Sequence, residues 1–505
     1  MLQTRILRRI SAMTASTSSA TPSTSEGHKD RSRYRPVIGL EVHVQLNTRT
    51  KLFSRTPAGL EAGPNRLVSP FDMALPGTMP ALNKQAVMHA LKMAKLLKCT
   101  VPEKSRFDRK HYFYADMPAG YQITQTDMPI ARDGSFAFHV FDEHVEPYWK
   151  EVPIIQLQLE QDSGKTIHHG KKCCALVEIV TTPCLRTALE ATCFVQHLRL
   201  ILMHYQICLG ELHRGHLRVD ANVSLSYDGK PGTRIEVKNI NSVRCLHTAI
   251  NYEIERQFSL LSRGEKIVKE TRAADPEGRT VSMREKEDDT DYRFIPEPNL
   301  PLLKIQPEWR EMNDRWVETQ PPPRFQKFRD EFGFNPRSAL HLAEDETLSS
   351  FIERCAEHFV PLENLTANDI LVWMKELKTT MQRSKDVYPP ASNRFAEQFV
   401  RAIDLYKKNR ITRLRMLDLL RNLSADQESR TVDQILDAED LWKIENADEI
   451  VSDLLKSQEK ISEKARQGHA KSFGRLRNLA VEGSRKRIDV DQIEASLKRL
   501  LGLKT

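Results

Sequence analysis

The segment IGLEVHVQL, residues 38–46, decides the fold of the first half of the chain. All its even-numbered residues are apolar, and such alternation with β-branched residues predicts a strand buried on one face. Glu41 and His43 then lie side by side on the other face. That face either meets water, as one face of an antiparallel sheet often does, or carries a site.

Three further segments repeat this pattern: IIQLQLEQDSGK (154–165), LRVDANVSL (217–225) and TRIEVKNINS (233–242). In the first, alternation predicts that Ile155, Leu157 and Leu159 face the core. If the four strands share a sheet, its polar face gathers carboxylates, amides, a lysine and the His43 imidazole. The residues expected there are Gln156, Gln158, Glu160, Asp162, Asp220, Asn222, Ser224, Glu236, Lys238, Asn239 and Asn241.

Such a donor set suits magnesium, which takes hard oxygen ligands and keeps positions for water and phosphate. Magnesium together with Lys238 would stabilise charge on a phosphoryl group during its transfer. The GKT at 164–166 is not a P-loop, because Leu159 stands where that motif requires glycine. The sequence therefore predicts a phosphoryl-transfer site built in another way, with a solvated polar face as the alternative.

Two more segments carry candidate residues. Glu178 lies in the apolar run ALVEIVTTP (175–183), where an ionised side chain is costly unless paired or metal-bound. The alternative is a strand end at which Glu178 reaches solvent. The charged run SMREKEDDTDYRFIPEPNLP (282–301) is either a solvated face or, through its aromatic pair around Arg293, a group that stacks on bases or clamps phosphate.

The 505 residues are enough for about three domains. Helical spacing predicts helices that begin near Leu82 and Thr187 inside a strand-rich region. After a proline-rich joint at 321–324 only helical patterns remain. We therefore expect an α+β protein with an antiparallel-sheet-rich domain over 36–300, an all-α domain over 301–440 and a small helical tail over 441–505.

The first 25 residues contain three arginines and no acid, and Ser or Thr fills ten of the fifteen positions from 11 to 25. This composition predicts a mitochondrial presequence and linker over 1–35, and a merely disordered tail is the alternative. Eight scattered cysteines without a CxxC pair predict a reducing compartment and disfavour zinc. The longest apolar stretch, from Cys193, is interrupted by polar residues, so membrane insertion is not expected.

Eight motifs in a fixed order carry a family resemblance. They are IGLEVHVQLNTRTKLF, ALPGTMPALNKQAV, RKHYFYADMPAGYQITQTDMPI, LEQDSGKTIH, ALVEIVTTP, LRVDANVSL, GTRIEVKNINS and MREKEDDTDYRFIPEPNLP. Over residues 37–501 the chain resembles the B subunits of glutamyl-tRNA(Gln) amidotransferases, the GatB/GatE family, in their mitochondrial form. The resemblance implies a catalytic cradle domain, a helical domain and a tail similar to the stand-alone YqeY-type proteins.

The resemblance also implies a reaction. Members of the family bind tRNA(Gln) charged with glutamate, phosphorylate the γ-carboxylate with ATP, and let ammonia displace phosphate to leave Gln-tRNA(Gln). The amidase-type A subunit makes the ammonia from glutamine, and the small C subunit joins the two into a heterotrimer in the mitochondrial matrix. ATP and Mg²⁺ are the implied cofactors, and Mg²⁺ with basic residues would stabilise the phosphoryl transfer.

Carried over residue by residue, the resemblance assigns three sets of side chains. The expected magnesium ligands are Glu41, His43, Glu160 and Glu178. The expected catalytic residues are Glu41, His43, Glu160, Asp162, Lys165 and Lys238. The residues expected to bind ATP, phosphate or the tRNA 3′ end are Asp220, Asn222, Asn239, Asn241 and Arg293.

The chain departs from the family pattern at three places. Bacterial relatives read LEEDAGK where this chain has Gln161, which offers a carbonyl oxygen but no charge. The loop after His169 reads GKKCC, shorter than the usual DLNR-like stretch, so the approach to Glu178 differs. Ser54 stands where many bacterial members begin a zinc-binding cysteine cluster, and no cysteine occurs before Cys99, so zinc is not expected.

Between Lys464 and Arg487 eight Lys or Arg residues stand against one acid, Glu482. This excess predicts a tail that contacts tRNA phosphates, and a solvated basic helix pair is the alternative. Two other functions stay open. One is a non-catalytic protein for tRNA binding or assembly, indicated by Gln161 and the short loop; the other is a free-standing metal-dependent phosphotransferase that acts on a small molecule.

Overall fold

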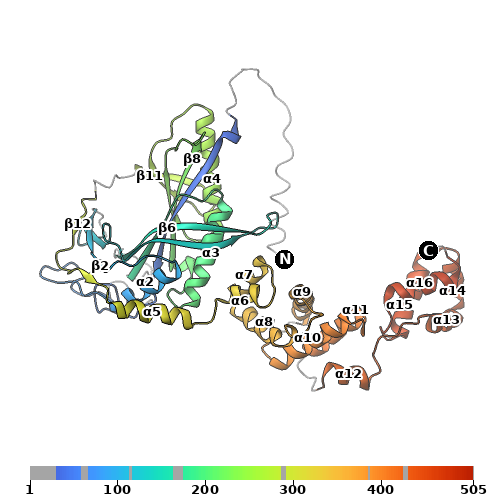
Figure 1. Ribbon diagram of the computed structural model, residues 1–505. Helices are drawn as coiled ribbons and strands as arrows, with labels where there is room; N and C mark the ends of the chain where they lie inside the picture. Colours follow the sequence, from blue (N-terminus) through green and yellow to red (C-terminus); the bar gives the residue numbers. More distant parts are fainter. Residues whose placement is uncertain are drawn as a thin grey trace, which may run out of the picture.

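The computed structural model describes residues 30–58, 66–112, 117–162, 175–285, 292–384, 387–424 and 430–503. The protein is α+β, as the sequence predicts: in these ranges every strand ends before residue 305, and helices follow. Figure 1 shows the strand-rich part at the left and the later helices running to the right, where the C-terminus lies. Residues 1–29 of the expected presequence and linker, Lys165 and the GKKCC loop fall outside the described residues, whereas Tyr34 and Arg35 at the end of that linker already belong to β1.

One eight-stranded sheet forms the centre of the strand-rich part, in the order β11-β10-β9-β8-β1-β7-β6-β5. Neighbouring strands are antiparallel except β9 and β10, which run parallel. The prediction that the four alternating segments share a sheet is confirmed. In sheet order the strands are β11 (Thr280–Glu285), β10 (Glu270–Ala274), β9 (Ile235–Ile240), β8 (Leu217–Tyr227), β1 (Tyr34–Gln45), β7 (Ala175–Thr181), β6 (Tyr148–Gln161) and β5 (Ala131–Val140).

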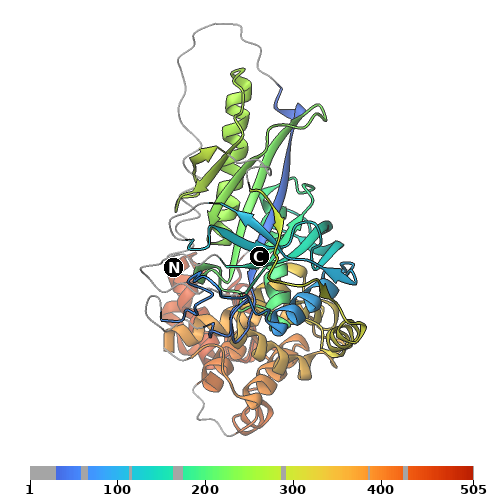
Figure 2. The ribbon, with the colours of Figure 1, turned by 90° about the vertical axis from the view of Figure 1, so that its left-hand side faces the viewer.

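Strand β1 lies inside this sheet and buries its apolar face completely. Leu40 and Val42 are at most 1% exposed, because α3 (Ala188–His204) and α4 (Val243–Ser262) pack on strands of the same sheet. Figure 2 shows the yellow-green helix α4 running alongside the long strands. Thr187 and Ser242 cap the two helices with their side-chain oxygens, so both helices begin at capping residues.

Strand β6 departs from the predicted alternation at one residue. A β-bulge between Ile154 and Gln156 shifts its register against β7. Ile154 is buried at 1% exposure, whereas Ile155 is 45% exposed, so the prediction that Ile155 faces the core is wrong. An extra residue in one strand reverses the side-chain phase before it, and beyond the bulge Leu157 is buried as expected.

Two small sheets accompany the large one. The first has the order β12-β3-β4, with β12 (Ile295–Pro296), β3 (Asp108–His111) and β4 (Tyr121–Thr124), and β4 packs on β6. The second pairs β13 (Leu303–Lys304) with β2 (Lys104–Ser105). The proline-rich stretch after Phe294 therefore returns to β3. Together the stretch and β3 bring basic and aromatic side chains near the polar face of the large sheet.

Three hydrophobic cores follow one another along the chain. The first includes the sheet, α2 (Lys84–Leu96) and α5 (Pro307–Thr319), whose tryptophans Trp309 and Trp316 pack against it. The predicted helix near Leu82 is α2, capped by Asn83. The second core lies among α6 (Arg324–Asp330), α7 (Pro336–Glu344), α8 (Glu346–Phe359), α9 (Ala367–Ser384), α10 (Asn393–Lys407), α11 (Arg413–Ser424) and α12 (Val432–Ala438), and the third among α13 (Asp448–Ser457), α14 (Glu459–Arg466), α15 (Ala470–Gly483) and α16 (Val490–Leu501).

Across the described ranges, no helix combines the length and apolar character that a membrane crossing requires.

Candidate functional site

The polar face of the large sheet carries a row of side chains across four strands. Gln158 on β6 pairs with Glu178 on β7, Glu178 with His43 on β1, and His43 with Arg218 on β8. Directly opposed residues point to the same face of an antiparallel sheet, so this row is fixed by strand register. Glu160 follows Gln158 by two residues and therefore joins the same face.

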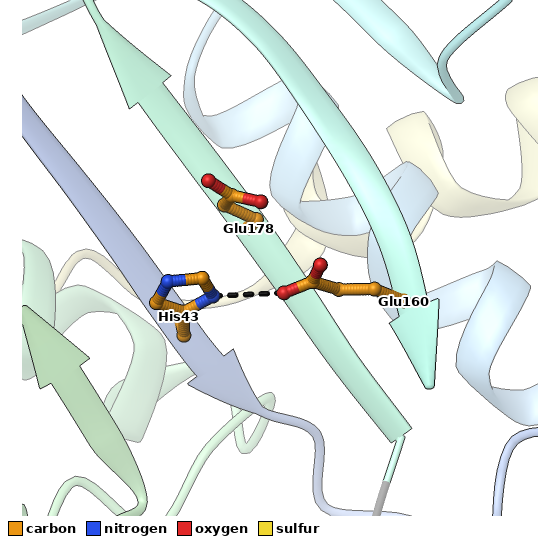
Figure 3. Close-up of side chains that lie close together, drawn as sticks. All are labelled: His43, Glu160 and Glu178. Carbon is orange, nitrogen blue, oxygen red and sulfur yellow. Dashed lines mark hydrogen bonds and ion pairs between the residues drawn. The ribbon is translucent and has the colours of Figure 1, made fainter. Parts of the chain in front are cut away.

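His43, Glu160 and Glu178 converge at the centre of this face (Figure 3). His43 Nδ1 lies 2.8 Å from Glu160 Oε1. One ligand atom from each of the three side chains lies within 4.8 Å of the other two, and no other such group of His, Cys, Asp or Glu occurs in the described part of the chain. Glu178 is 8% exposed in the middle of β7, so it does not stand at a solvated strand end.

The ionisation of these three groups reflects their crowding. Burial alone would lower the pKa of His43, but the charge of Glu178 and the bonds to Asp220 and Glu160 raise it well above its usual value. Burial, reinforced by the charge of Glu160, raises the pKa of Glu178 to about 7. A positive ion between these carboxylates would relieve their repulsion, so the site favours a cation.

Asp220 connects His43 to Lys238. Its Oδ2 lies 3.6 Å from His43 Nε2 and accepts a 2.7 Å hydrogen bond from Lys238 Nζ. Burial opposes the charged form of Lys238, but Asp220 and Glu236 outweigh it and raise the pKa of Lys238. Lys238 therefore keeps a positive charge beside the acids, where it can meet an anionic group of a ligand.

Glu41 lies on the same face, two residues before His43 and opposite Asp220 in the register. Its Oε1 accepts a 2.9 Å hydrogen bond from Asn222 Nδ2. Its carboxylate is not part of the group of three, but its charge acts on both Glu178 and Lys238. Glu41 and Asn222 thus form the edge of the site that lies between Glu178 and Lys238.

The remaining expected residues lie around this centre. Asp162 directly follows the end of β6 and lies 3.4 Å from Arg218. Asn239 and Asn241 are exposed at the end of β9, beyond Lys238. Arg293 is exposed beside β3, and its carbonyl lies 2.8 Å from His111 Nδ1. The structure brings the first three toward the large sheet and places Arg293 at the small one.

Two residues of the small sheet were not expected in the site. The charge of Lys110 on β3 lowers the pKa values of both Glu160 and Glu178, and its Nζ lies 4.6 Å from the centre of the Tyr292 ring. Gln122 on β4 lies 3.4 Å from Glu160 Oε2, toward which its Nε2 donates a hydrogen bond. Lys110 belongs to a motif that carried the resemblance, but the face that a four-residue strand presents cannot be read from its sequence.

A family model described as the GatB/GatE catalytic domain matches residues 36–311. The chain belongs to the GatB/GatE family. It is 36% identical to the B subunit of the mitochondrial glutamyl-tRNA(Gln) amidotransferase of Aedes aegypti over 502 residues, 93% of each chain. It is 48% identical to the mitochondrial B subunit of Danio rerio over 285 residues, 53% of this chain and 51% of the relative. It is 39% identical to the B subunit of the aspartyl/glutamyl-tRNA(Asn/Gln) amidotransferase of Bdellovibrio bacteriovorus over 367 residues, 70% of this chain and 75% of the relative.

The family expected from the motifs is thereby confirmed. This GatB/GatE chain is the B subunit of an amidotransferase, an enzyme of the ATP-dependent ligase class. Its His43 group fits a divalent cation, because it offers one imidazole and two carboxylates whose ligand atoms lie within 4.8 Å of one another. Ser54, which stands where the cysteine cluster of bacterial relatives would begin, instead donates to Asp72, and Asp72 also pairs with Lys51.

In this GatB/GatE chain, part of the basic loop between α15 and α16 is turned inward. Lys486 Nζ donates to Asp418 of α11 at 2.6 Å, and Arg487 donates to Asp440 at 2.8 Å. Arg485 donates to the carbonyl of Glu439 at 2.9 Å. These three bases therefore hold the tail against the preceding helices. The bases that remain exposed on the tail include Lys464, Arg466, Lys471 and Arg475.

Proposed function

We propose that this chain is the catalytic B subunit of a mitochondrial amidotransferase that converts Glu-tRNA(Gln) into Gln-tRNA(Gln). Its partners are the amidase-type A subunit, which supplies ammonia from glutamine, and the small C subunit. The match to the mitochondrial relative from Aedes aegypti, over 93% of both chains, supports the setting, as does the arginine-rich, acid-free start of the sequence. The location that follows is the mitochondrial matrix.

The proposed reaction has two steps. In the first, an oxygen of the glutamyl γ-carboxylate attacks the γ-phosphorus of ATP, the bond to ADP breaks, and an acyl phosphate forms. In the second, the nitrogen of ammonia attacks the acyl carbon, phosphate leaves with the bonding electrons, and the nitrogen gives up a proton. Mg²⁺, when bound, would neutralise charge on the phosphate oxygens.

The residues of the chain have separate tasks in this proposal. His43, Glu160 and Glu178 hold the divalent cation, with Glu41 at their edge. Lys238, fixed by Asp220, faces the anionic phosphoryl group and stabilises it as charge develops. The further set expected to contact ATP, phosphate or the tRNA 3′ end comprises Asp162, Lys165, Asn222, Asn239, Asn241 and Arg293.

The regions of the chain divide this work. We assign residues 36–300 to the catalytic cradle, 301–440 to the helical domain and 441–505 to the tRNA-binding tail. We assign the presequence and linker to residues 1–35, of which the last two, Tyr34 and Arg35, already pair with β8. The exposed tail bases support phosphate contact there, since phosphate binding needs positive charge but no particular sequence.

The convergence of His43, Glu160 and Glu178 is the single observation that carries the proposal. We expect Glu178→Gln, in the reconstituted heterotrimer, to lower ATP-dependent amidation by at least about 100-fold. Glutamine hydrolysis by the A subunit should continue, because its chemistry takes place on another chain. Glu308→Gln, the same change at an exposed position of α5, is the matched control. Undiminished amidation by Glu178→Gln would refute the catalytic assignment.

A wider substrate range is a second candidate, because the Bdellovibrio bacteriovorus relative is named for both tRNA(Asn) and tRNA(Gln). The same complex should be given Asp-tRNA(Asn) and Glu-tRNA(Gln) in parallel, with ATP and glutamine. Product from Glu-tRNA(Gln) alone supports the narrower proposal. Product from neither substrate refutes tRNA amidation, and binding of tRNA without product would favour the non-catalytic alternative.

A further inference from the structure

Two glutamines on β6 form a line of hydrogen bonds that ends on Glu178. Gln156 Nε2 donates to Gln158 Oε1 at 2.6 Å, and Gln158 Nε2 donates to Glu178 Oε2. Gln158 and Glu178 are directly opposed across β6 and β7, so strand register brings them together. Among the described residues, Gln158 is the one recorded hydrogen-bond donor to the Glu178 carboxylate.

The direction of this line is fixed by its last member, because an ionised carboxylate can only accept hydrogen bonds. The oxygen and nitrogen of a glutamine amide can exchange places by rotation about one bond. If Gln158 turned over, its oxygen would face the Glu178 carboxylate and its NH₂ would face the NH₂ of Gln156. Both contacts would then be repulsive. The Glu178 carboxylate therefore keeps the donor end of Gln158 toward itself, and Gln156 donates to the oxygen of the Gln158 amide.

The bond from Gln158 also makes the two carboxylate oxygens of Glu178 different. Oε2 of Glu178 is taken by Gln158 on the β6 side. His43 opposes Glu178 from the β1 side of β7, where one carboxylate oxygen of Glu178 joins the group of three. A carboxylate held at one oxygen presents a single oriented oxygen to a cation, and such outer hydrogen bonds typically orient metal ligands.

We propose that Gln158 is a positioning residue that orients Glu178 as a one-oxygen ligand for the divalent cation, and that Gln156 supports Gln158 through the bond to its amide oxygen. This inference rests on the proposed function of the site. It adds two residues that touch neither the cation nor the substrate. Their effect should appear in cation affinity and leave the chemical step unchanged once the site is filled.

The test uses the full chain and Mn²⁺ as the probe, with free Mn²⁺ measured by electron paramagnetic resonance. Gln158→Met keeps the length of the side chain and removes the donor, so we expect the Mn²⁺ Kd to rise by about 10-fold. Gln156→Met leaves the donor but removes the bond to the Gln158 amide oxygen, so we expect a rise of about 2- to 5-fold. Gln326→Met, a half-exposed glutamine of α6, is the control and should leave Kd unchanged.

A second measurement separates positioning from a general loss of structure. In the reconstituted complex, Gln158→Met should raise the Mg²⁺ concentration that gives half-maximal amidation by the same factor as the Mn²⁺ Kd. The rate at saturating Mg²⁺ should stay within about 2-fold of the unmodified protein. A merely structural role would lower that rate and the melting temperature together without moving the Mg²⁺ dependence.

The outcomes distinguish this inference from the function on which it rests. An unchanged Mn²⁺ Kd for Gln158→Met overturns the positioning role while the metal site stands. The proposed metal site fails if the unmodified chain binds no Mn²⁺, or if Glu178→Gln leaves its Mn²⁺ binding unchanged. In either case the positioning role fails with it. A lower amidation rate at saturating Mg²⁺, with an unchanged Mg²⁺ concentration for half-maximal amidation, likewise overturns the positioning role.

Discussion

Replacement of Glu297 by alanine should open the small sheet beside the site. Glu297 is 3% exposed and accepts two hydrogen bonds from Arg109, at 2.7 and 2.9 Å. It also accepts one from the backbone N–H of Asn299 at 2.9 Å. The pair ties the proline-rich stretch to β3, and the guanidinium also lies 4.2 Å from the Tyr121 ring centre.

The magnitude follows from what the alanine leaves behind. Breaking a buried ion pair on one side typically costs about 3–5 kcal/mol, because the partner charge stays buried. The Arg109 side chain keeps 19% of its surface in water, so we expect the lower end, about 3 kcal/mol. Since about 1.4 kcal/mol is a factor of ten, local opening should increase by about 100-fold.

Hydrogen exchange read by mass spectrometry measures this opening. The amides of His111 and Glu297 report on it directly, because they bond to Tyr292 and Phe107 across the junction. Amidation should fall as well, since Lys110 is the next residue on β3. Asp453→Ala, which breaks a pair with Lys456 at 3.5 Å that is over 70% exposed on both sides, should cost under about 0.5 kcal/mol. Exchange at β3 that stays at the unmodified rate in Glu297→Ala would refute this reasoning.

Three further predictions concern the tail and the first core. The double variant Lys464→Glu, Arg475→Glu should weaken tRNA binding and reduce its dependence on salt by about one unit of slope per lost phosphate contact; an unchanged salt titration contradicts tail binding. Lys486→Ala should instead speed hydrogen exchange around Asp418 on α11, because it removes two hydrogen bonds of 2.6 and 2.8 Å. Protection equal to that of the unmodified chain would show that this contact does not hold the tail against α11. Burial lowers the pKa of His197 to about 4, so the neutral ring is favoured on folding. The stability that the neutral ring contributes should therefore be fully present above about pH 6.5, and the free energy of unfolding should fall by up to about 3 kcal/mol toward pH 4. His197→Met should flatten that fall in thermal melts.

The sequence predicted the parts of this protein that depend on one strand or one helix at a time. The alternation in β1 places His43 on the polar face and Val42 in the core, because side-chain direction in a strand follows from position alone. The same rule fails at Ile155, because a bulge depends on the partner strand β7 and leaves no mark in the sequence of β6.

The parts that could not be predicted depend on contacts between distant segments. Lys110 lies near the acids because it pairs with Gln122 of β4, and β4 packs on β6 more than twenty residues further along the chain. The tail bases were read as one phosphate-binding set, yet Lys486 and Arg487 neutralise acids of the preceding region. Charge counted along a sequence cannot separate bases that bind a ligand from bases that fix a neighbouring segment.

The departure at Gln161 bears on whether the site is catalytic at all. Gln161 directly follows Glu160 on β6, and successive residues of a strand point to opposite faces. A carboxylate at 161 would therefore leave the face on which His43, Glu160 and Glu178 meet. The Gln161 side chain lies against β4, where its Oε1 accepts a 3.5 Å hydrogen bond from the backbone N–H of Ile123. Loss of the acid at this position removes no member of the group of three, and it gives no support to a chain that binds tRNA without acting on it.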